Sequence, residues 1–200
     1  MSDTPSISTP PTVTEKVFDF VDERVGLKLL TAKMLNEAVP GGSRWAYVFG
    51  SILLFIFAMQ AVTGVLLMFY YVPTADHAYA STQYILHDVD YGWYLLSYHF
   101  WGSSAMVVCV FAHMSQVFLW GAYKKPRELI WVVGLVLFAL VMAFGFTGYL
   151  LPWDQRAYWA TTVGVEIIDK VPVLGDFLAR FLKGGATPGQ MTLSRFFVIH

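Results

Sequence analysis

The chain has 200 residues, of which 56% are hydrophobic and 14% are charged, and its formal net charge is −1. A charged fraction well below the quarter or so that is usual in soluble domains indicates a membrane protein, and the balanced charge provides no broad basic face for nucleic acid. The single cysteine, Cys109, lies in an apolar run without a disulfide partner, which argues against thiol redox chemistry.

The N-terminal region is polar at first and then amphipathic. Residues 1–13 are rich in proline, serine and threonine and lack the charged start and apolar core of a signal peptide, so they are expected to form a disordered tail. Residues 14–38 place apolar side chains at helical spacing between charges of both signs. This pattern predicts an amphipathic helix at the membrane surface. The alternative is a surface helix packed on a soluble partner protein.

Three long runs without charged residues follow, and each exceeds the ~20 residues that a helix needs to cross the hydrocarbon core. A fourth apolar run begins at about Thr192 and reaches only His200, too short to cross. The sequence therefore predicts an all-α membrane domain over residues 44–200, with three complete spans and the start of a fourth. The complete spans are predicted at 45–72, 92–120 and 129–151.

Lysine and arginine are distributed unequally between the connecting segments. The segment before the first span includes Lys28, Lys33 and Arg44, and three more cations lie in the loop between the second and third spans, whereas the loop 73–91 has none. By the positive-inside rule, the N-terminus and the second loop face the cytoplasm, the n side. The loop 73–91 and residues 152–191, which are expected to form short surface helices, then lie on the opposite p side.

Two histidines, His99 and His113, lie within the second span. Their fourteen-residue separation corresponds to ~21 Å and nearly four complete turns, so both project from almost the same face, one near each membrane surface. An ionisable residue inside a membrane indicates a functional site. His77 and His87, in the loop 73–91, are interpreted as solvated.

Glycines repeat the same fourteen-residue spacing, as Gly50 and Gly64 in the first span and as Gly134 and Gly148 in the third. Each histidine level thus has one glycine from each flanking span, where a large flat group can approach the backbone. A lone histidine in a span often makes only an interhelical hydrogen bond, and glycines often only permit close packing. The three matching spacings favour a haem at each level, with histidine as the axial ligand.

The predicted fourth span supplies a second ligand at one level. His200 lies about as deep in that span as His99 lies in the second, so the two are expected to bind the iron of a p-side haem. His113 is expected to bind an n-side haem iron. Its partner would lie near position 214, either further along this polypeptide or in another one.

Several motifs resemble cytochrome b of the quinol-oxidising bc complexes, particularly the short photosynthetic and bacterial form. Besides the histidines and glycines, they are "YKKPREL" after the second span, "GYLLPWDQRAYWA" after the third, and "TLSRFFVIH" before the end. The resemblance covers residues from about 14 to 200. It implies a four-helix di-haem bundle with two non-covalent haem b groups, in a bacterial inner membrane.

The resemblance also implies a quinone cycle. Quinol is oxidised near the p side, and one electron goes to a Rieske-type iron-sulfur protein and a c-type cytochrome, while the other crosses the membrane to reduce quinone at the n side. The remaining cytochrome b portion or a second subunit, in a dimeric complex, would complete the machinery. The quinol pocket region would include Trp153, Asp154, Tyr158 and Thr162.

The sequence departs from this family at three positions. Leu96 and Gln116 stand where arginines usually serve haem propionates, which leaves Arg195, Arg44 and the cluster Lys124 to Arg127 as candidate partners. Val48 stands where the photosynthetic short form has a cysteine that binds an extra haem, so no covalent haem is expected.

Two other functions remain open from the sequence. One is a haem b membrane anchor that links the quinone pool to another oxidoreductase without electron bifurcation. The other is a non-redox transporter or assembly protein, which would contain no haem.

Overall fold

The computed structural model describes residues 12–26, 28, 29, 31, 32, 36 and 48–200. Arg44 and nearly all of the predicted tail lie outside these residues. The chain divides into two compact units, 1–45 and 46–200. Throughout the described residues all regular secondary structure is helical, which confirms the predicted all-α class.

The N-terminal unit contains α1, Val13–Val25. The helix begins with a capping box, in which Thr12 Oγ1 accepts from the Glu15 backbone N–H at 3.3 Å and Glu15 accepts from the Thr12 backbone N–H at 2.6 Å. It ends at Gly26, whose φ of 67° is left-handed and whose N–H bonds to Asp22 O. The helix predicted over 14–38 is therefore interrupted after Val25, and the later part of that range is described only in part.

Three helices of the second unit are long and apolar enough to cross a membrane. They are α3 (Phe49–Met68), α5 (Gly92–Leu119) and α6 (Glu128–Leu150). The predicted start of a fourth span corresponds to α9, Gln190–Ile199, with His200 as its C-cap. Apolar side chains such as Phe55 and Ile130 are exposed along these helices, as expected for surfaces that face lipid or partner helices.

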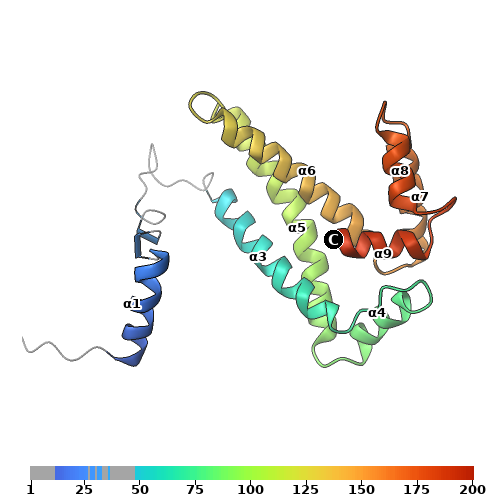
Figure 1. Cartoon of the computed structure of the whole chain (residues 1–200), viewed down its shortest axis with the longest axis horizontal. Coiled ribbons are helices and arrows are strands. Elements are labelled where there is room, and N and C mark those ends of the chain that lie inside the picture. Colours follow the sequence, from blue (N-terminus) through green and yellow to red (C-terminus); the bar gives the residue numbers. More distant parts are fainter. Residues whose placement is uncertain (1–11, 27, 30, 33–35, 37–47) are drawn as a thin grey trace, which may run out of the picture. The chain divides into compact units, whose positions relative to one another are not determined.

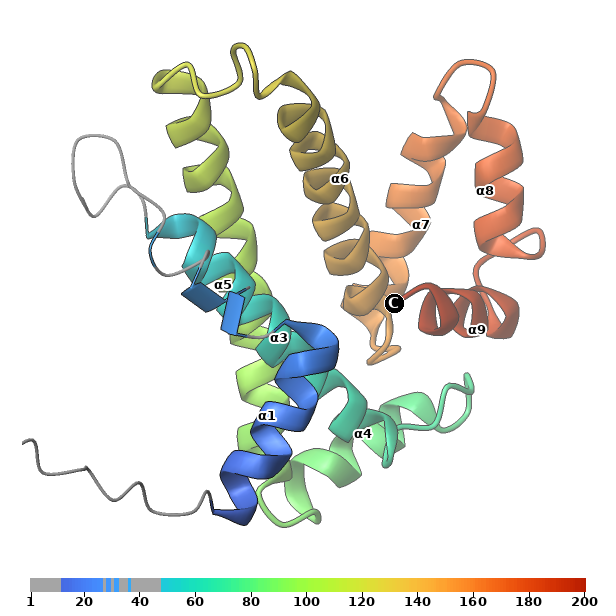
Figure 2. The same ribbon diagram turned by 60° about the vertical axis from the view of Figure 1, so that its left-hand side comes forward.

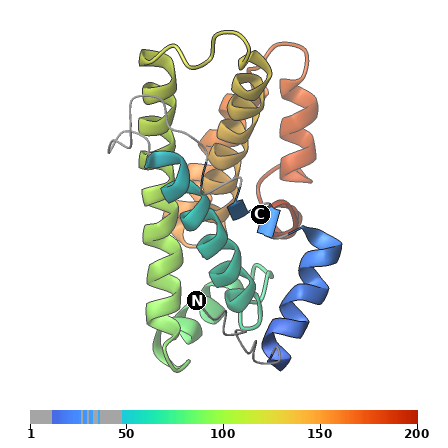
Figure 3. The same ribbon diagram turned by 90° about the vertical axis from the view of Figure 1, so that its left-hand side faces the viewer.

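The spans pack in two pairs. Helix α3 lies along α5, as Figures 1 and 3 show, and α6 packs against α9. Helices α5 and α6 are joined by the loop 120–127 and touch through Phe111 and Phe138, whose ring centroids are 5.1 Å apart. In each pair, one helix, α3 or α6, carries glycines of the fourteen-residue pattern. Its neighbour, α5 or α9, carries or ends at a histidine that is predicted to bind haem iron.

Shorter helices complete the second unit. Residues 73–91, predicted as a loop, contain α4, Ala78–His87. The segment 152–191 contains α7, Gln155–Asp169, and α8, Gly175–Lys183, which form a hairpin beside α6 and α9 in Figure 2.

A buried core joins α6, α7, α8 and α9. Leu150, Val165, Leu193 and Phe196 are all 1% exposed or less. Tyr71, which follows α3, donates its hydroxyl to Leu151 O at 2.6 Å. This packing fixes the end of α9, and with it His200, against α6.

Candidate functional site

His99 on α5 and His200 at the end of α9 lie next to each other, although 101 positions separate them in the sequence. Their ring centroids are 6.2 Å apart and their planes are inclined by 75°. A metal bound between two imidazole nitrogens, at about 2 Å from each, requires nitrogens about 4 Å apart and ring centres somewhat further apart. The spacing of this pair fits two axial ligands of one iron.

A glycine lies against each of these rings. A Cβ built on Gly64 would lie 3.3 Å from His99 Cε1, and one built on Gly148 would lie 2.5 Å from His200 Cε1. The second approach leaves no room for a side chain. Glycines on α3 and α6 therefore let the helix backbone approach both imidazole rings closely, one on each side of the histidine pair.

Two threonines that the sequence analysis did not single out contact the same histidines. Thr63 Oγ1 lies 2.9 Å from His99 Nδ1, and Thr147 Oγ1 lies 3.3 Å from His200 Nδ1. Both threonines are buried. Each directly precedes a glycine of the predicted pattern, and this repeated Thr-Gly pair is the sequence signal that could have identified them.

Gln60 is a second polar residue that the sequence analysis missed. Its side-chain Nε2 donates to His99 O at 2.9 Å and so connects α3 to α5 at the level of the histidine. The amide occupies the space that a side chain on Gly102 would need. Gly102 thus permits the interhelical hydrogen bond.

The second level contains His113 and Gly50. A Cβ on Gly50 would lie 3.6 Å from His113 Cε1. His113 Nδ1 and Gln116 Oε1 are buried and have no hydrogen-bond partner among the described residues. A half-buried imidazole beside a glycine, with a buried Nδ1 that has no partner in the described part of the chain, suits a haem ligand. Gly134, the fourth glycine of the pattern, has no atom within 4 Å of its built Cβ.

The candidate partners for haem propionates do not converge on the histidines. Arg195 donates to Phe181 O and its guanidinium lies 5.2 Å from the Phe181 ring centroid, so its charge is engaged at the end of α8. Lys124 and Arg127 are exposed in the loop between α5 and α6, and Leu96 is half-buried on α5.

The residues expected near a quinol pocket lie together at the start of α7. Trp153 has a left-handed backbone, and its ring centroid is 5.8 Å from that of Tyr158. Thr162 donates to Tyr158 O, and Asp154 Oδ1 accepts from the Ala157 backbone N–H at 2.7 Å as the N-cap of α7. The Asp154 carboxylate thus has a structural role in this arrangement.

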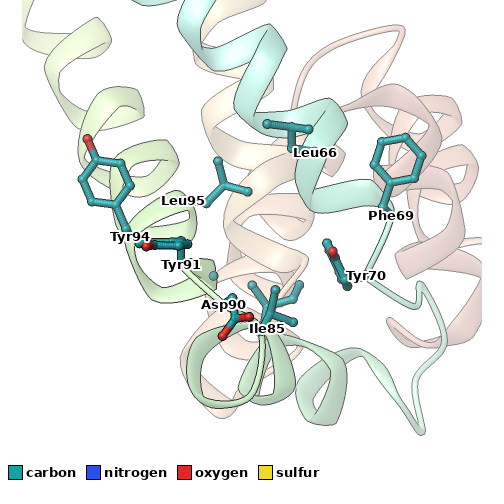
Figure 4. A pocket seen from close by; sticks show the side chains of 10 residues that line it. Leu66, Phe69, Tyr70, Ile85, Asp90, Tyr91, Tyr94 and Leu95 are labelled. Carbon is teal, nitrogen blue, oxygen red and sulfur yellow. The ribbon is translucent and has the colours of Figure 1, made fainter.

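A cavity of about 350 Å³ lies elsewhere, between α3, α4 and the start of α5. Figure 4 shows Leu66 and Phe69 on one side and Asp90 and Tyr91 on the other. None of the predicted site residues lines this cavity.

The chain is similar to several known proteins. Residues 34–200 match the family described as cytochrome b/b6/petB. The chain is 42% identical to the cytochrome b6 of Synechococcus elongatus over 185 residues, which cover 92% of this chain and 86% of that protein. It is also similar to a solved chain of a hyperthermophilic respiratory Complex III, with a TM-score of 0.78 and 31% identity over 90% of this chain. The chain spans about half, 49%, of the length of that structural relative.

Proposed function

The chain belongs to the cytochrome b/b6 family, and from this membership we propose that it is the di-haem subunit of a bc-type quinol oxidoreductase. In this role it carries electrons across the membrane between quinol oxidation at the p side and quinone reduction at the n side. It is an electron-transfer subunit that requires its partners for turnover.

The observation that carries the proposal is the pairing of histidines with glycines at two levels of one helix. His99 lies beside His200 between Gly64 and Gly148, and His113 lies beside Gly50. The fourteen residues between His99 and His113 correspond to ~21 Å along α5. Two redox groups at this separation would span much of the ~30 Å hydrocarbon core.

Each histidine and glycine of the site has a proposed role. A haem b with histidine ligands supplies an iron that changes its charge by one electron at a time. His99 and His200 bind at the p-side level, and His113 binds at the n-side level with a second ligand from further polypeptide. Gly50, Gly64 and Gly148 keep side chains away from the macrocycle, with Gly134 proposed for the same task on α6, and the apolar spans exclude water.

Charge at the haem edges is proposed to come from several sources. With Leu96 and Gln116 at the two positions where arginines usually serve the propionates, cations must reach them from Arg44 or the cluster Lys124 to Arg127 at the n side. Arg195 remains a p-side candidate only if it leaves the carbonyl of Phe181. Val48 stands at the position of the covalent haem cysteine, so both haems are proposed to be non-covalent.

The partners are proposed from the likeness to the family. A Rieske-type iron-sulfur protein and a c-type cytochrome would accept one electron of each quinol, and the remaining cytochrome b portion or a second subunit would complete the bundle in a dimeric complex. The aromatic cluster of Trp153 and Tyr158 is proposed to line the quinol pocket. The protein is proposed to lie in a bacterial inner membrane with its N-terminus in the cytoplasm.

Similarity to cytochrome b6 and to a respiratory Complex III chain favours this function over a haem b anchor without bifurcation. The test is a redox titration of the purified complex, followed by absorbance in the b-type alpha band. We expect two b-type components with different midpoint potentials, and reduction of both by quinol. A preparation without an alpha band would refute the haem assignment, whereas haems that quinol cannot reduce would refute the quinol oxidoreductase.

A further inference from the structure

The two p-side histidines meet the same local structure on different helices. On α3 the pair Thr63 and Gly64 contacts His99, and on α6 the pair Thr147 and Gly148 contacts His200. In each case the glycine lies against Cε1 of the imidazole and the threonine hydroxyl lies beside Nδ1. Because the same contact of a Thr-Gly pair with an imidazole occurs on two helices, we do not attribute it to chance packing.

The hydrogen-bond direction at Thr63 follows from its other contacts. Its Oγ1 lies 2.8 Å from Met59 O and 3.2 Å from Gln60 O, and both carbonyls can only accept. With its single proton on Met59 O, the nearer carbonyl, Oγ1 accepts from His99, which is the direction that leaves His99 Nε2 free to bind iron. His99 Nδ1 therefore carries a proton, and the neutral ring presents the lone pair of its Nε2 to the site.

Thr147 repeats this geometry with one difference. Its Oγ1 lies 2.8 Å from Ala143 O and 3.2 Å from Phe144 O, so it too accepts from the histidine. His200 Nδ1, however, also lies 3.0 Å from Phe144 O. The His200 N–H has a backbone acceptor besides the hydroxyl, whereas among the described residues the hydroxyl of Thr63 is the one acceptor recorded at His99 Nδ1.

We propose that Thr63 and Thr147 are positioning residues that fix the tautomer and the ring orientation of the two axial ligands of the p-side haem, with Thr63 the more important. The inference rests on the proposed haem-binding function. Acceptors on the second nitrogen of a metal-binding histidine make the ligand more basic. A more basic ligand stabilises the ferric state, so these threonines lower the midpoint potential of the p-side haem.

The test uses the intact complex and the variants Thr63→Val and Thr147→Val, which remove the hydroxyl at nearly constant volume. Thr63→Ser and Thr147→Ser keep the hydroxyl. Thr82→Val is the matched control, because the Thr82 hydroxyl also donates to its own helix, to Ala78 O at 2.9 Å, but has no hydrogen bond to a histidine among the described residues. The readouts are the midpoint potentials of both haems and the low-temperature EPR spectrum, which reports the orientation of the axial ligands.

We expect Thr63→Val to raise the midpoint potential of the p-side haem. The ferric-to-ferrous ratio at a given potential should change by about two- to tenfold, which is about the contribution of one hydrogen bond. A tenfold change corresponds to about 59 mV for one electron. Thr147→Val should give a smaller shift, both serine variants should resemble the wild type, and the n-side haem should not change. Loss of the p-side haem in Thr63→Val but not in Thr63→Ser would also support the proposal.

Unchanged p-side potential and EPR spectrum in Thr63→Val would overturn the inference while leaving the haem function intact. The same holds if Thr63→Ser behaves like Thr63→Val, since packing and not the hydroxyl would then matter. A wild-type complex without any b-type haem would overturn the proposed function itself, and the inference with it.

Discussion

Gly148 lies so close to the imidazole of His200 that a Cβ on the glycine would come within 2.5 Å of Cε1 and 3.0 Å of Nδ1. Among the four glycines of the fourteen-residue pattern this is the tightest contact, since the built Cβ contacts at Gly64 and Gly50 are 3.3 and 3.6 Å and a Cβ built on Gly134 meets no atom within 4 Å. Because His200 is fixed by the core around Phe196 and Leu193, it cannot withdraw without disturbing α9. Of these four glycines, Gly148 is therefore the one at which an added methyl group should disturb a histidine most.

Gly148→Ala is expected to displace His200 and to remove or destabilise the p-side haem, leaving the n-side haem in place. Overpacking of this kind typically costs about 1–3 kcal/mol. Gly145→Ala is the matched control, because Gly145 lies on the same helix and its built Cβ meets no atom within 4 Å. The measurement is the number of haems per complex, from difference spectra. Equal haem content in the two variants would contradict the close approach.

Substitution of the α5 histidines should separate the two levels. His99→Ala is expected to remove the p-side haem and spare the n-side one, and His113→Ala is expected to do the reverse, because each haem loses an axial ligand at its own level only. Redox titration should then show a single b-type component in each variant, with the potential of the component that the other variant lacks. Two haems retained in either variant would refute the assignment of levels.

The sequence predicted best those features that depend only on the spacing of residues along a helix. The interval between His99 and His113 fixes their separation and common face through helix geometry, and the fold class follows from three long apolar runs. The N-terminal helix was less predictable. Gly26 lies within an amphipathic pattern, and periodicity does not distinguish a glycine that continues a helix from one that adopts a left-handed conformation and ends it.

Partners of polar groups within the spans could not be predicted in the same way. The hydroxyl of Thr63 and the amide of Gln60 could each pair with groups of their own helix or of a neighbouring helix, and only the packing of α3 on α5 brings both to His99. Arg195 is the corresponding case among the charges. Its place in the motif before His200 favours a haem propionate, but α8 brings the carbonyl and the ring of Phe181 closer.

Arg195→Met is accordingly expected to lower stability and to leave both haem potentials unchanged. The variant keeps most of the apolar stem but loses a hydrogen bond from a charged group, which contributes about 1.5–3 kcal/mol where it is buried and less for this half-exposed side chain. Arg156→Met is the control, because no ion pair or hydrogen bond of the Arg156 side chain occurs among the described residues. Thermal unfolding of the complex, together with redox titration, would check this. A fall in the p-side potential of Arg195→Met would instead restore Arg195 as a propionate partner.

Asp154 offers a test of whether the quinol pocket region uses its carboxylate. Its Oδ1 accepts from the Ala157 N–H as the N-cap of α7, and asparagine caps a helix about as well as aspartate, whereas alanine at this position costs about 1 kcal/mol. Asp154→Asn should therefore keep both the unfolding temperature and quinol turnover, and Asp154→Ala should lower the unfolding temperature. Purified variant complexes would be compared by thermal unfolding and by steady-state turnover with quinol. If Asp154→Asn keeps its stability but loses turnover, the carboxylate takes part in the chemistry as well as in the cap.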